Sequence, residues 1–352
     1  MAELESNLET VCEHEPKVES RTVATRSHGD VRVHVQGSLD QMQSKAVFLT
    51  VHDIGANHSS WKDFVDNESM LEIKNRSVFV HLDVCGQEAD AEDLEGDFPT
   101  IQQISHCEEV LADVLDALHV PLVVGLGEGA GANILARFAL RHPERVLGLV
   151  LVHLVSAEVG FLDALKDRLF FRRNSQQMSP LDIVALHKIG KERDETSRRL
   201  MDAYGARVQT INARNLRKYV TAYMERKEIA DLRELDVLLV TGAKSPYCAG
   251  VEAIHSKCNK TKTSLLKVDE CTDVISEFPD KLAQSLLLFA KGLGFLTSCP
   301  SADGKSRPED SGLHRSPAHS LDGGIRFNDN ELVINNEEFV RRSKPEFNGS
   351  SV

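Results

Sequence analysis

The stretch VVGLGEGAG, residues Val123–Gly131, decides the fold. It starts as an apolar strand, turns sharply at its glycines, and continues into a helical pattern over residues 132–142. A strand, tight turn and helix of this shape carries the nucleophile of α/β-hydrolases, in the pattern G-x-S-x-G. Here the central residue of the pattern is Gly129, so the turn is present and the nucleophile is absent.

Strands and helices alternate on both sides of this turn. Apolar runs that are typical of strands buried on both faces occupy residues 46–52, 77–83, 120–125, 146–154, 237–242 and 263–268. Helical patterns occupy residues 61–73, 100–119, 130–140 and 279–293, and residues 20–26 and 31–36 indicate an entry hairpin. The sequence therefore predicts an α/β fold, α/β-hydrolase-like, with a mostly parallel sheet and helices on both faces.

The chain changes character after the strand at 146–154. Residues 157–228 have helical patterning and many arginines, which predicts a helical cap inserted over the carboxyl edge of the sheet. We interpret Arg198, Arg199, Arg214, Arg217 and Lys218 as a solvated face, with a surface for an acidic partner as the alternative. The predicted organisation is an acidic arm (1–19), a core (20–156 and 229–296), the cap (157–228) and a largely disordered tail (297–352).

Composition excludes several classes of function. The formal net charge of −13 argues against a general nucleic-acid binder. The longest apolar run, residues 146–155, is too short to cross a bilayer, and the N-terminus lacks the apolar run of a signal peptide. The seven dispersed cysteines indicate reduced thiols and show no metal-binding spacing. We expect a cytoplasmic protein without metal, cofactor or transmembrane segment, whose partners are other proteins; peripheral membrane association stays open.

A second motif overlaps the turn. Residues 125–130, GLGEGA, match the dinucleotide-binding pattern G-x-G-x-x-A. That pattern opens the first βαβ unit of its fold and requires an acidic residue about 20 positions further on. Here two strands precede it and the next strand ends at Val152-His153, so NAD binding is the weaker interpretation.

Hydrolysis through an acyl-enzyme needs a nucleophile, an acid and a base, which follow in that order on this fold. The acid position, after the strand at 237–242, holds Ser245, and the base position, after the strand at 263–268, holds Thr272. With Gly129 at the nucleophile position, all three are vacant. Loss of the nucleophile alone costs on the order of 10⁶ in kcat in a serine hydrolase, so the sequence predicts a protein that is not a triad enzyme.

The remaining candidate pocket residues are His52, Asp53, Gly55, Glu128 and Ala130. We interpret the first three as a tight turn in which the Asp53 side chain caps local amides, and Asp83 as a turn residue of the same kind. Glu128 next to a helix N-terminus is interpreted as an exposed first-turn residue, with a substitute nucleophile or base as the alternative.

His153, at the end of a buried strand, is interpreted as a satisfied core histidine rather than a base.

With these motifs identified, the chain resembles the N-myc downstream-regulated (Ndr) family over roughly residues 20–295. The resemblance rests on VHDIG with Asn57-His58, on His81-Leu82-Asp83 with Gly86-Gln87, and on GLGEGAG with Arg137-Phe138-Ala139; residues 148–152 and 260–267 continue it. It implies an α/β-hydrolase fold with a helical cap and no working triad. It also implies a cytoplasmic protein linked to differentiation, stress response and signalling.

The leading hypothesis is a non-catalytic adaptor or scaffold that acts through protein–protein contacts. The alternatives are a hydrolase or lyase with a non-standard site that uses Glu128, Asp53 or His52, and a module that binds a small molecule. In the tail, Ser316 and Ser343 follow basic residues and are candidate phosphorylation sites.

Overall fold

The computed structural model describes residues 18–26, 29–95, 105–156, 177–190, 194–229, 232–296, 325–328 and 331–334. Residues 1–17 of the predicted arm, residues 157–176 of the predicted cap and most of the predicted tail lie outside these ranges. The candidate phosphorylation sites Ser316 and Ser343 are among the residues that are not described.

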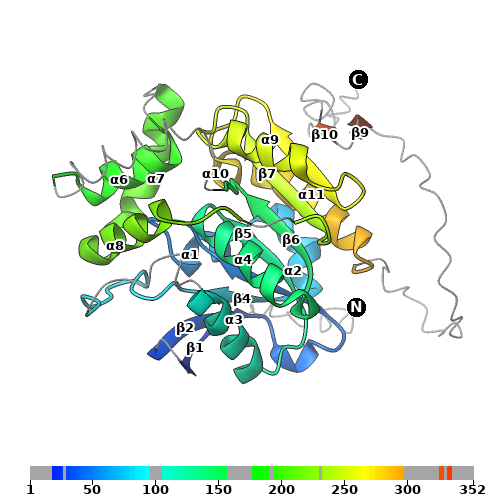
Figure 1. Ribbon diagram of the computed structural model, residues 1–352, viewed down its shortest axis with the longest axis horizontal. Helices are drawn as coiled ribbons and strands as arrows, with labels where there is room; N and C mark the ends of the chain where they lie inside the picture. The colour runs from blue at the N-terminus through cyan, green and yellow to red at the C-terminus, as the bar shows by residue number, and fades with distance from the viewer. Residues whose placement is uncertain are drawn as a thin grey trace, which may run out of the picture.

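The described strands form one ten-stranded sheet in the order β1-β2-β4-β3-β5-β6-β7-β8-β10-β9. Neighbours from β4 to β10 run parallel, whereas the β1–β2, β2–β4 and β10–β9 pairs are antiparallel. The mostly parallel sheet confirms the predicted α/β fold class (Figure 1). The strands are β1 (Val18–Thr25), β2 (Gly29–Gln36), β3 (Ala46–Val51), β4 (Ser77–Leu82), β5 (Val123–Glu128), β6 (Val146–Val152), β7 (Val237–Gly242), β8 (Thr263–Val268), β9 (Ile325–Asn328) and β10 (Glu331–Ile334).

Several strands differ in their bounds from the prediction, and β1 and β5 show the physical reasons most clearly. β1 includes Val18 and Glu19, which the sequence assigned to the arm, because Val18 pairs with Gln36 across the hairpin. β5 continues to Glu128 instead of ending at Gly125. A Cβ on Gly125 would lie 2.6 Å from Leu149 Cδ2, so this glycine permits close packing inside the strand and does not mark its end.

The described helices pack on both faces of the sheet and above its carboxyl edge. They are α1 (His58–Val65), α2 (Leu71–Asn75), α3 (Ser105–Ala117), α4 (Ala130–Arg141), α6 (Pro180–Lys188), α7 (Glu195–Val208), α8 (Ala213–Met224), α9 (Cys248–Lys257), α10 (Val274–Glu277) and α11 (Pro279–Gly292). The helix predicted over residues 61–73 is divided into α1, a 3-10 turn (Glu68–Met70) and α2. The division occurs at Asn67, whose side chain accepts the N–H of Ser69 and begins a new turn.

Alternate residues of the central strands supply two hydrophobic layers. Leu49 and Leu151 belong to the layer that includes α3, α4 and the cap helices, and Phe48 and Val150 belong to the layer with α1 and α11. This alternation is the period of two that a strand imposes on its side chains. Because both faces are covered, β3, β5 and β7 are buried along their whole length.

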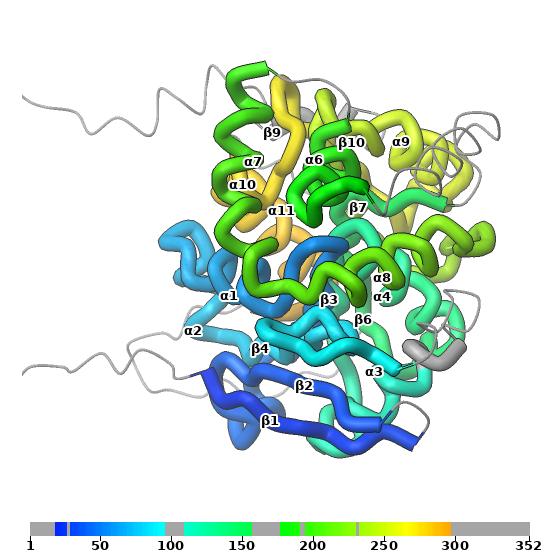
Figure 2. Tube along the Cα trace, turned by 90° about the vertical axis from the view of Figure 1, so that its left-hand side faces the viewer, coloured from blue at the N-terminus to red at the C-terminus, as the bar shows by residue number. Residues whose placement is uncertain are grey.

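The cap helices α6, α7 and α8 lie together beside the sheet (Figures 1 and 2). An ion pair and a hydrogen bond join α8 to the acidic loop that follows β4. Arg214 pairs with Asp93 at 2.9 Å, and Lys218 Nζ donates to the Leu94 carbonyl at 2.7 Å. The prediction of a solvated face is therefore wrong for Arg217 and Lys218, which are half-buried, and is confirmed for Arg214, whose side chain is 65% exposed. It is also confirmed for Arg198 and Arg199, whose side chains are 72% and 80% exposed.

Among the residues that the structure describes, no helix has the length and apolar character required to cross a bilayer.

Candidate functional site

The predicted elbow is formed by the end of β5, Gly129 and the start of α4. Gly129 is the N-cap of α4 and has φ +52°, a backbone conformation that side-chain-bearing residues adopt only under strain. A Cβ placed on Gly129 would overlap the carboxylate carbon and both carboxylate oxygens of Asp53. The space in which a nucleophile would begin is therefore filled by another side chain of the same protein.

Asp53 reaches this position from the loop after β3. Its Oδ1 accepts the backbone N–H of Ala130 at 2.8 Å. On α/β-hydrolases the N–H of the residue after the nucleophile is one of the donors that bind the oxyanion of the reaction. In this chain the donor is already bonded to an internal carboxylate, and Asp53 is only 1% exposed.

The prediction for Asp53 is thus partly wrong. The tight turn is present, because the Asp53 carbonyl accepts the Ala56 N–H at 3.2 Å and Gly55 has φ +74°. The side chain does not cap that turn and bonds across the molecule instead. Asp83 departs from its prediction in the same way, since its carboxylate bonds His34 and His58.

Two residues at the end of the cap helix α6 hold the Asp53 carboxylate. His187 Nε2 donates to Asp53 Oδ2 at 2.9 Å, and Lys188 Nζ lies 3.0 Å from the same oxygen. Burial alone would raise the pKa of Asp53, but the charges of His187 and Lys188 and the hydrogen bonds from His187 and Ala130 lower it well below its ordinary value. Asp53 is therefore a permanent anion under the cap.

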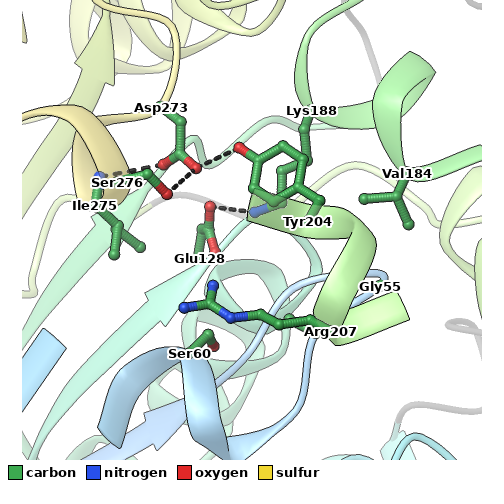
Figure 3. Close-up of a pocket in the computed structure, with 11 residues that line it drawn as sticks. Gly55, Ser60, Glu128, Val184, Lys188, Tyr204, Arg207, Asp273, Ile275 and Ser276 are labelled. Atoms are coloured by element: carbon green, nitrogen blue, oxygen red, sulfur yellow. Dashed lines mark hydrogen bonds and ion pairs between the residues drawn. The ribbon is translucent and has the colours of Figure 1, made fainter. Parts of the chain in front are cut away.

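Lys188 also pairs with Glu128, the last residue of β5 (Figure 3). Glu128 is 3% exposed, so the prediction of an exposed first-turn residue is wrong. Burial, together with the Asp273 and Asp53 carboxylates, raises the pKa of Glu128 to about 7 in spite of the Lys188 ammonium. Burial would lower the pKa of Lys188, but Asp53 and Glu128 raise it above its ordinary value, so the ammonium stays charged between the two carboxyl groups.

A small cavity lies next to this ion pair. It is lined by Gly55, Ala56, Ser60, Glu128, Val184, Lys188, Tyr204, Arg207, Asp273, Ile275 and Ser276. Its volume is about 10 Å³, which is room for roughly one water molecule. On one wall, Tyr204 of α7 donates to Asp273 Oδ2, and Asp273 also accepts from Ser276 Oγ at 2.8 Å and from the Ile275 N–H at 3.1 Å (Figure 3).

The cap is in close contact with the loop below it. A Cβ on Gly55 would overlap Cγ2 of Val184 in α6. Val184 is 1% exposed. The α6 helix therefore covers the loop so tightly that even an alanine at position 55 requires a movement of the cap.

The other predicted site residues have structural partners. His52 donates through Nδ1 to the Asp53 carbonyl and accepts the Val84 N–H through Nε2, both at 2.9 Å, and burial lowers its pKa. Ser245 Oγ accepts the Tyr247 N–H at 3.2 Å, and the Thr272 N–H donates to Glu277 at 2.8 Å. Neither Ser245 nor Thr272 is among the residues that line the cavity.

His153 directly follows β6 and is buried, as predicted, but it is not satisfied. Its Nε2 has no hydrogen-bond partner among the described residues, and its Nδ1 lies 4.0 Å from Glu128 Oε1. Burial lowers the pKa of His153 to about 4, so the ring is neutral at physiological pH.

Sequence reasoning missed the residues that complete the site: His187, Lys188, Tyr204, Tyr247 and Asp273. The Tyr247 hydroxyl lies 2.6 Å from His187 Nδ1, so Asp53, His187 and Tyr247 form a continuous hydrogen-bonded chain. The signal that could have found the cap residues is the apolar helix PLDIVALHK, whose last two residues are basic. Tyr247 and Asp273 stand two and one positions after the vacant positions at Ser245 and Thr272.

The sequence of this chain is similar to those of known proteins. Residues 21–297 match the profile of the Ndr family. A Caenorhabditis elegans protein without an assigned function is 39% identical over 80% of this chain and 87% of its own length. Protein NDRG3 of Xenopus laevis is 30% identical over 86% of each chain, and Protein NDRG1 of Xenopus tropicalis is 32% identical over 77% of this chain and 70% of its own.

Solved structures of hydrolases share the fold. A hydrolase from Pseudomonas aeruginosa has a TM-score of 0.61 at 18% identity, over 77% of this chain and 98% of its own. A carboxylesterase from the thaumarchaeon Nitrososphaera has a TM-score of 0.63 at 16% identity, over 78% of this chain and 99% of its own. At these identities the likeness concerns the α/β-hydrolase fold alone.

Proposed function

The chain belongs to the Ndr family, and on that basis we propose that it is a non-catalytic adaptor or scaffold with an α/β-hydrolase-like fold. Its contacts are with other proteins, in cytoplasmic signalling, differentiation or the stress response. Ndr family members are generally non-enzymatic, which supports the first part of the proposal.

One observation carries the proposal: the Asp53 carboxylate is bonded to the Ala130 N–H and fills the space beside Gly129. A hydrolase needs that N–H for a transient anion that forms only in the reaction. A permanent, buried carboxylate at the same donor opposes binding of a second anion. Electrostatic repulsion between the two would raise the barrier instead of lowering it.

The closed cap supports the same conclusion. His187 and Lys188 bond Asp53 and Glu128, and the cavity next to this ion pair has a volume of about 10 Å³. An acyl substrate would require the cap to separate from two buried carboxyl groups. The outer surface of the cap, with the exposed Arg198 and Arg199, is available to a partner.

The chain Asp53–His187–Tyr247 favours a second candidate, a hydrolase with a tyrosine nucleophile. Here Asp53 would orient His187, and His187 would accept the Tyr247 proton. Against this, burial raises the pKa of Tyr247 well above 10, with Tyr223 and Asp53 contributing in the same direction. A phenol with a raised pKa is a poorer nucleophile at neutral pH, so we rank this candidate second.

An affinity-capture experiment tests the adaptor proposal. The intact chain is compared with an Arg198→Glu/Arg199→Glu variant, which changes two exposed side chains on α7 and leaves the buried ion pairs intact. We expect a reproducible binding protein that the variant captures less well. The absence of any reproducible partner for both chains, together with turnover of an ester substrate by the intact chain, would contradict the proposal.

A further inference from the structure

A second polar cluster lies at the antiparallel side of the sheet. It joins Asp83, which follows β4, to His34 of β2 and His58, the first residue of α1. His34 Nε2 and His58 Nδ1 both lie 2.9 Å from Asp83 Oδ2. The three residues are far apart in the sequence and meet because β2 pairs with β4 while α1 begins beside them.

The two imidazole rings are stacked. Their centroids are 3.4 Å apart and their planes meet at 14°. Both rings thus direct a nitrogen toward one carboxylate oxygen, and the three potential ligand atoms lie within 4.8 Å of one another. Two imidazole nitrogens and a carboxylate oxygen are the protein ligands of zinc sites that keep a fourth position for water.

The groups around the cluster hold the ligands in place. Ser20 Oγ lies 2.8 Å from His34 Nδ1, and the His58 N–H donates to Asp83 Oδ1 at 2.6 Å. The Asp83 backbone is itself fixed, since its N–H donates to the Arg32 carbonyl at 3.1 Å. Partners of this kind orient the ligands of a metal and raise their affinity for it. The Ser20 hydroxyl can bond the His34 ring both with and without a metal ion, because it accepts from Nδ1–H when Nε2 binds the metal.

Two neighbouring histidines show that the cluster differs from ordinary buried histidines. His52 has both ring nitrogens bonded to the backbone, at the Asp53 carbonyl and the Val84 N–H. His81 bonds Thr50 through Nδ1 at 2.7 Å and Gln36 through Nε2 at 3.2 Å. Their nitrogens are occupied by neutral partners, so neither ring is available to an ion. His34 and His58 instead both contact one anion, the Asp83 carboxylate.

The cluster can also be reached from solvent. The His58 side chain is 22% exposed, whereas those of His34 and Asp83 are 6% and 1% exposed. Parallel rings point their lone pairs in parallel, and a bound ion requires them to converge. The partly exposed ring of His58 is the one that can turn outward to allow this, while His34 stays held by Ser20.

We propose that His34 Nε2, His58 Nδ1 and Asp83 Oδ2 bind one zinc ion, with water as the fourth ligand. On binding, the ion takes the place of the imidazole N–H that now points at the carboxylate: a neutral ring carries its one proton on the other nitrogen instead, and a protonated ring keeps that N–H and releases one proton to solvent. The ion would join the β1–β2 hairpin, α1 and β4. This site is independent of the proposed adaptor function and of the Asp53 cluster.

Cobalt substitution on the full chain tests the proposal. The background carries His314→Gln and His319→Gln, so that the tail imidazoles do not contribute. We expect one equivalent of Co²⁺ to give the visible d–d spectrum of a four-coordinate ion with nitrogen and oxygen ligands, and one equivalent of Zn²⁺ to abolish it. The absence of that spectrum would overturn the proposal without any variant.

Three variants then assign the ligands. His58→Gln, on a partly exposed residue, should remove the spectrum, and Ser20→Ala should weaken the metal affinity about 10–100-fold. The matched control is His142→Gln, which removes an imidazole that lies 3.3 Å from Glu144 on the surface. Zinc should raise the melting temperature of the control and not of His58→Gln. Equal zinc affinity in the two variants would overturn the assignment.

Discussion

The Asp53 carboxylate accepts the backbone N–H of Ala130 at 2.8 Å, at the point where α/β-hydrolases bind the oxyanion of their reaction. The same carboxylate contacts Gly129 so closely that no Cβ fits there. The chain has thus kept the elbow and placed its own anion where a transient anion would bind.

Gly129→Ala should destabilise the fold by about 1–3 kcal/mol, since the new methyl group overlaps Asp53 and position 129 has a positive φ. Urea unfolding followed by circular dichroism measures the change. The control is Gly205→Ala in α7, where a Cβ meets no atom of the described residues within 4 Å. That change should stabilise by about 0.4–1 kcal/mol, because alanine restricts the unfolded chain. Equal stability of the two variants would show that Asp53 does not fill the elbow.

Lys188→Met should cost about 3–5 kcal/mol, because it leaves Asp53 and Glu128 buried without their ammonium partner. The comparison is Lys257→Met, whose partner Glu228 is 3.7 Å away and whose side chain is 69% exposed. The control should lose no more than about 1 kcal/mol. A Lys188→Met protein as stable as the control would mean that the cap does not close over the two carboxyl groups.

The raised pKa of Glu128 predicts a pH dependence of stability. The folded state favours the protonated carboxyl group, so its contribution is fully present below the unfolded pKa of 4.5 and is lost as the pH rises through about 7. Relative to Glu128→Gln, the natural chain should therefore lose on the order of 3 kcal/mol between about pH 5 and pH 8. Chemical unfolding of both chains across this range measures the difference. A constant difference would indicate that the pKa of Glu128 is not raised.

Tyr204→Phe should destabilise by about 1.5–3 kcal/mol, since it removes a hydrogen bond from a buried hydroxyl to the Asp273 carboxylate. Tyr223→Phe is the matched control from the neighbouring helix α8. The Tyr223 hydroxyl is buried and has no hydrogen-bond partner in the described structure, so its removal should be neutral or stabilising. Thermal and urea unfolding distinguish the two, and a larger loss at Tyr223 would contradict the assigned hydrogen bonds.

Most strands and helices were predictable because the sequence pattern that indicates each one lies within the element itself. β7 and β8 have the predicted bounds, since each is an apolar run of strand length with polar residues on both sides. The prediction of one helix over residues 61–73 was wrong because the Asn67 side chain begins a new turn at a position where the apolar spacing continues. A capping interaction of one side chain is not visible in hydrophobic periodicity.

The site was only partly predictable, because its decisive contacts join distant residues. Glycine at position 129 can be read directly, but the carboxylate that fills its space comes from Asp53, 76 positions earlier in the sequence. Asp53 and Asp83 were interpreted as local turn residues, since such side chains commonly bond their own backbone. In the structure they bond His187 and Lys188 of the cap, or His34 and His58, and no local pattern contains those pairings.

The most direct test of the central claim is a kinetic comparison of the natural chain with His187→Gln and Tyr247→Phe on ester, thioester and amide substrates. The account predicts no turnover above buffer for any of the three chains, at any pH between about 5 and 9. Saturable turnover by the natural chain that disappears in both variants would contradict it, and would identify Asp53, His187 and Tyr247 as working catalytic residues.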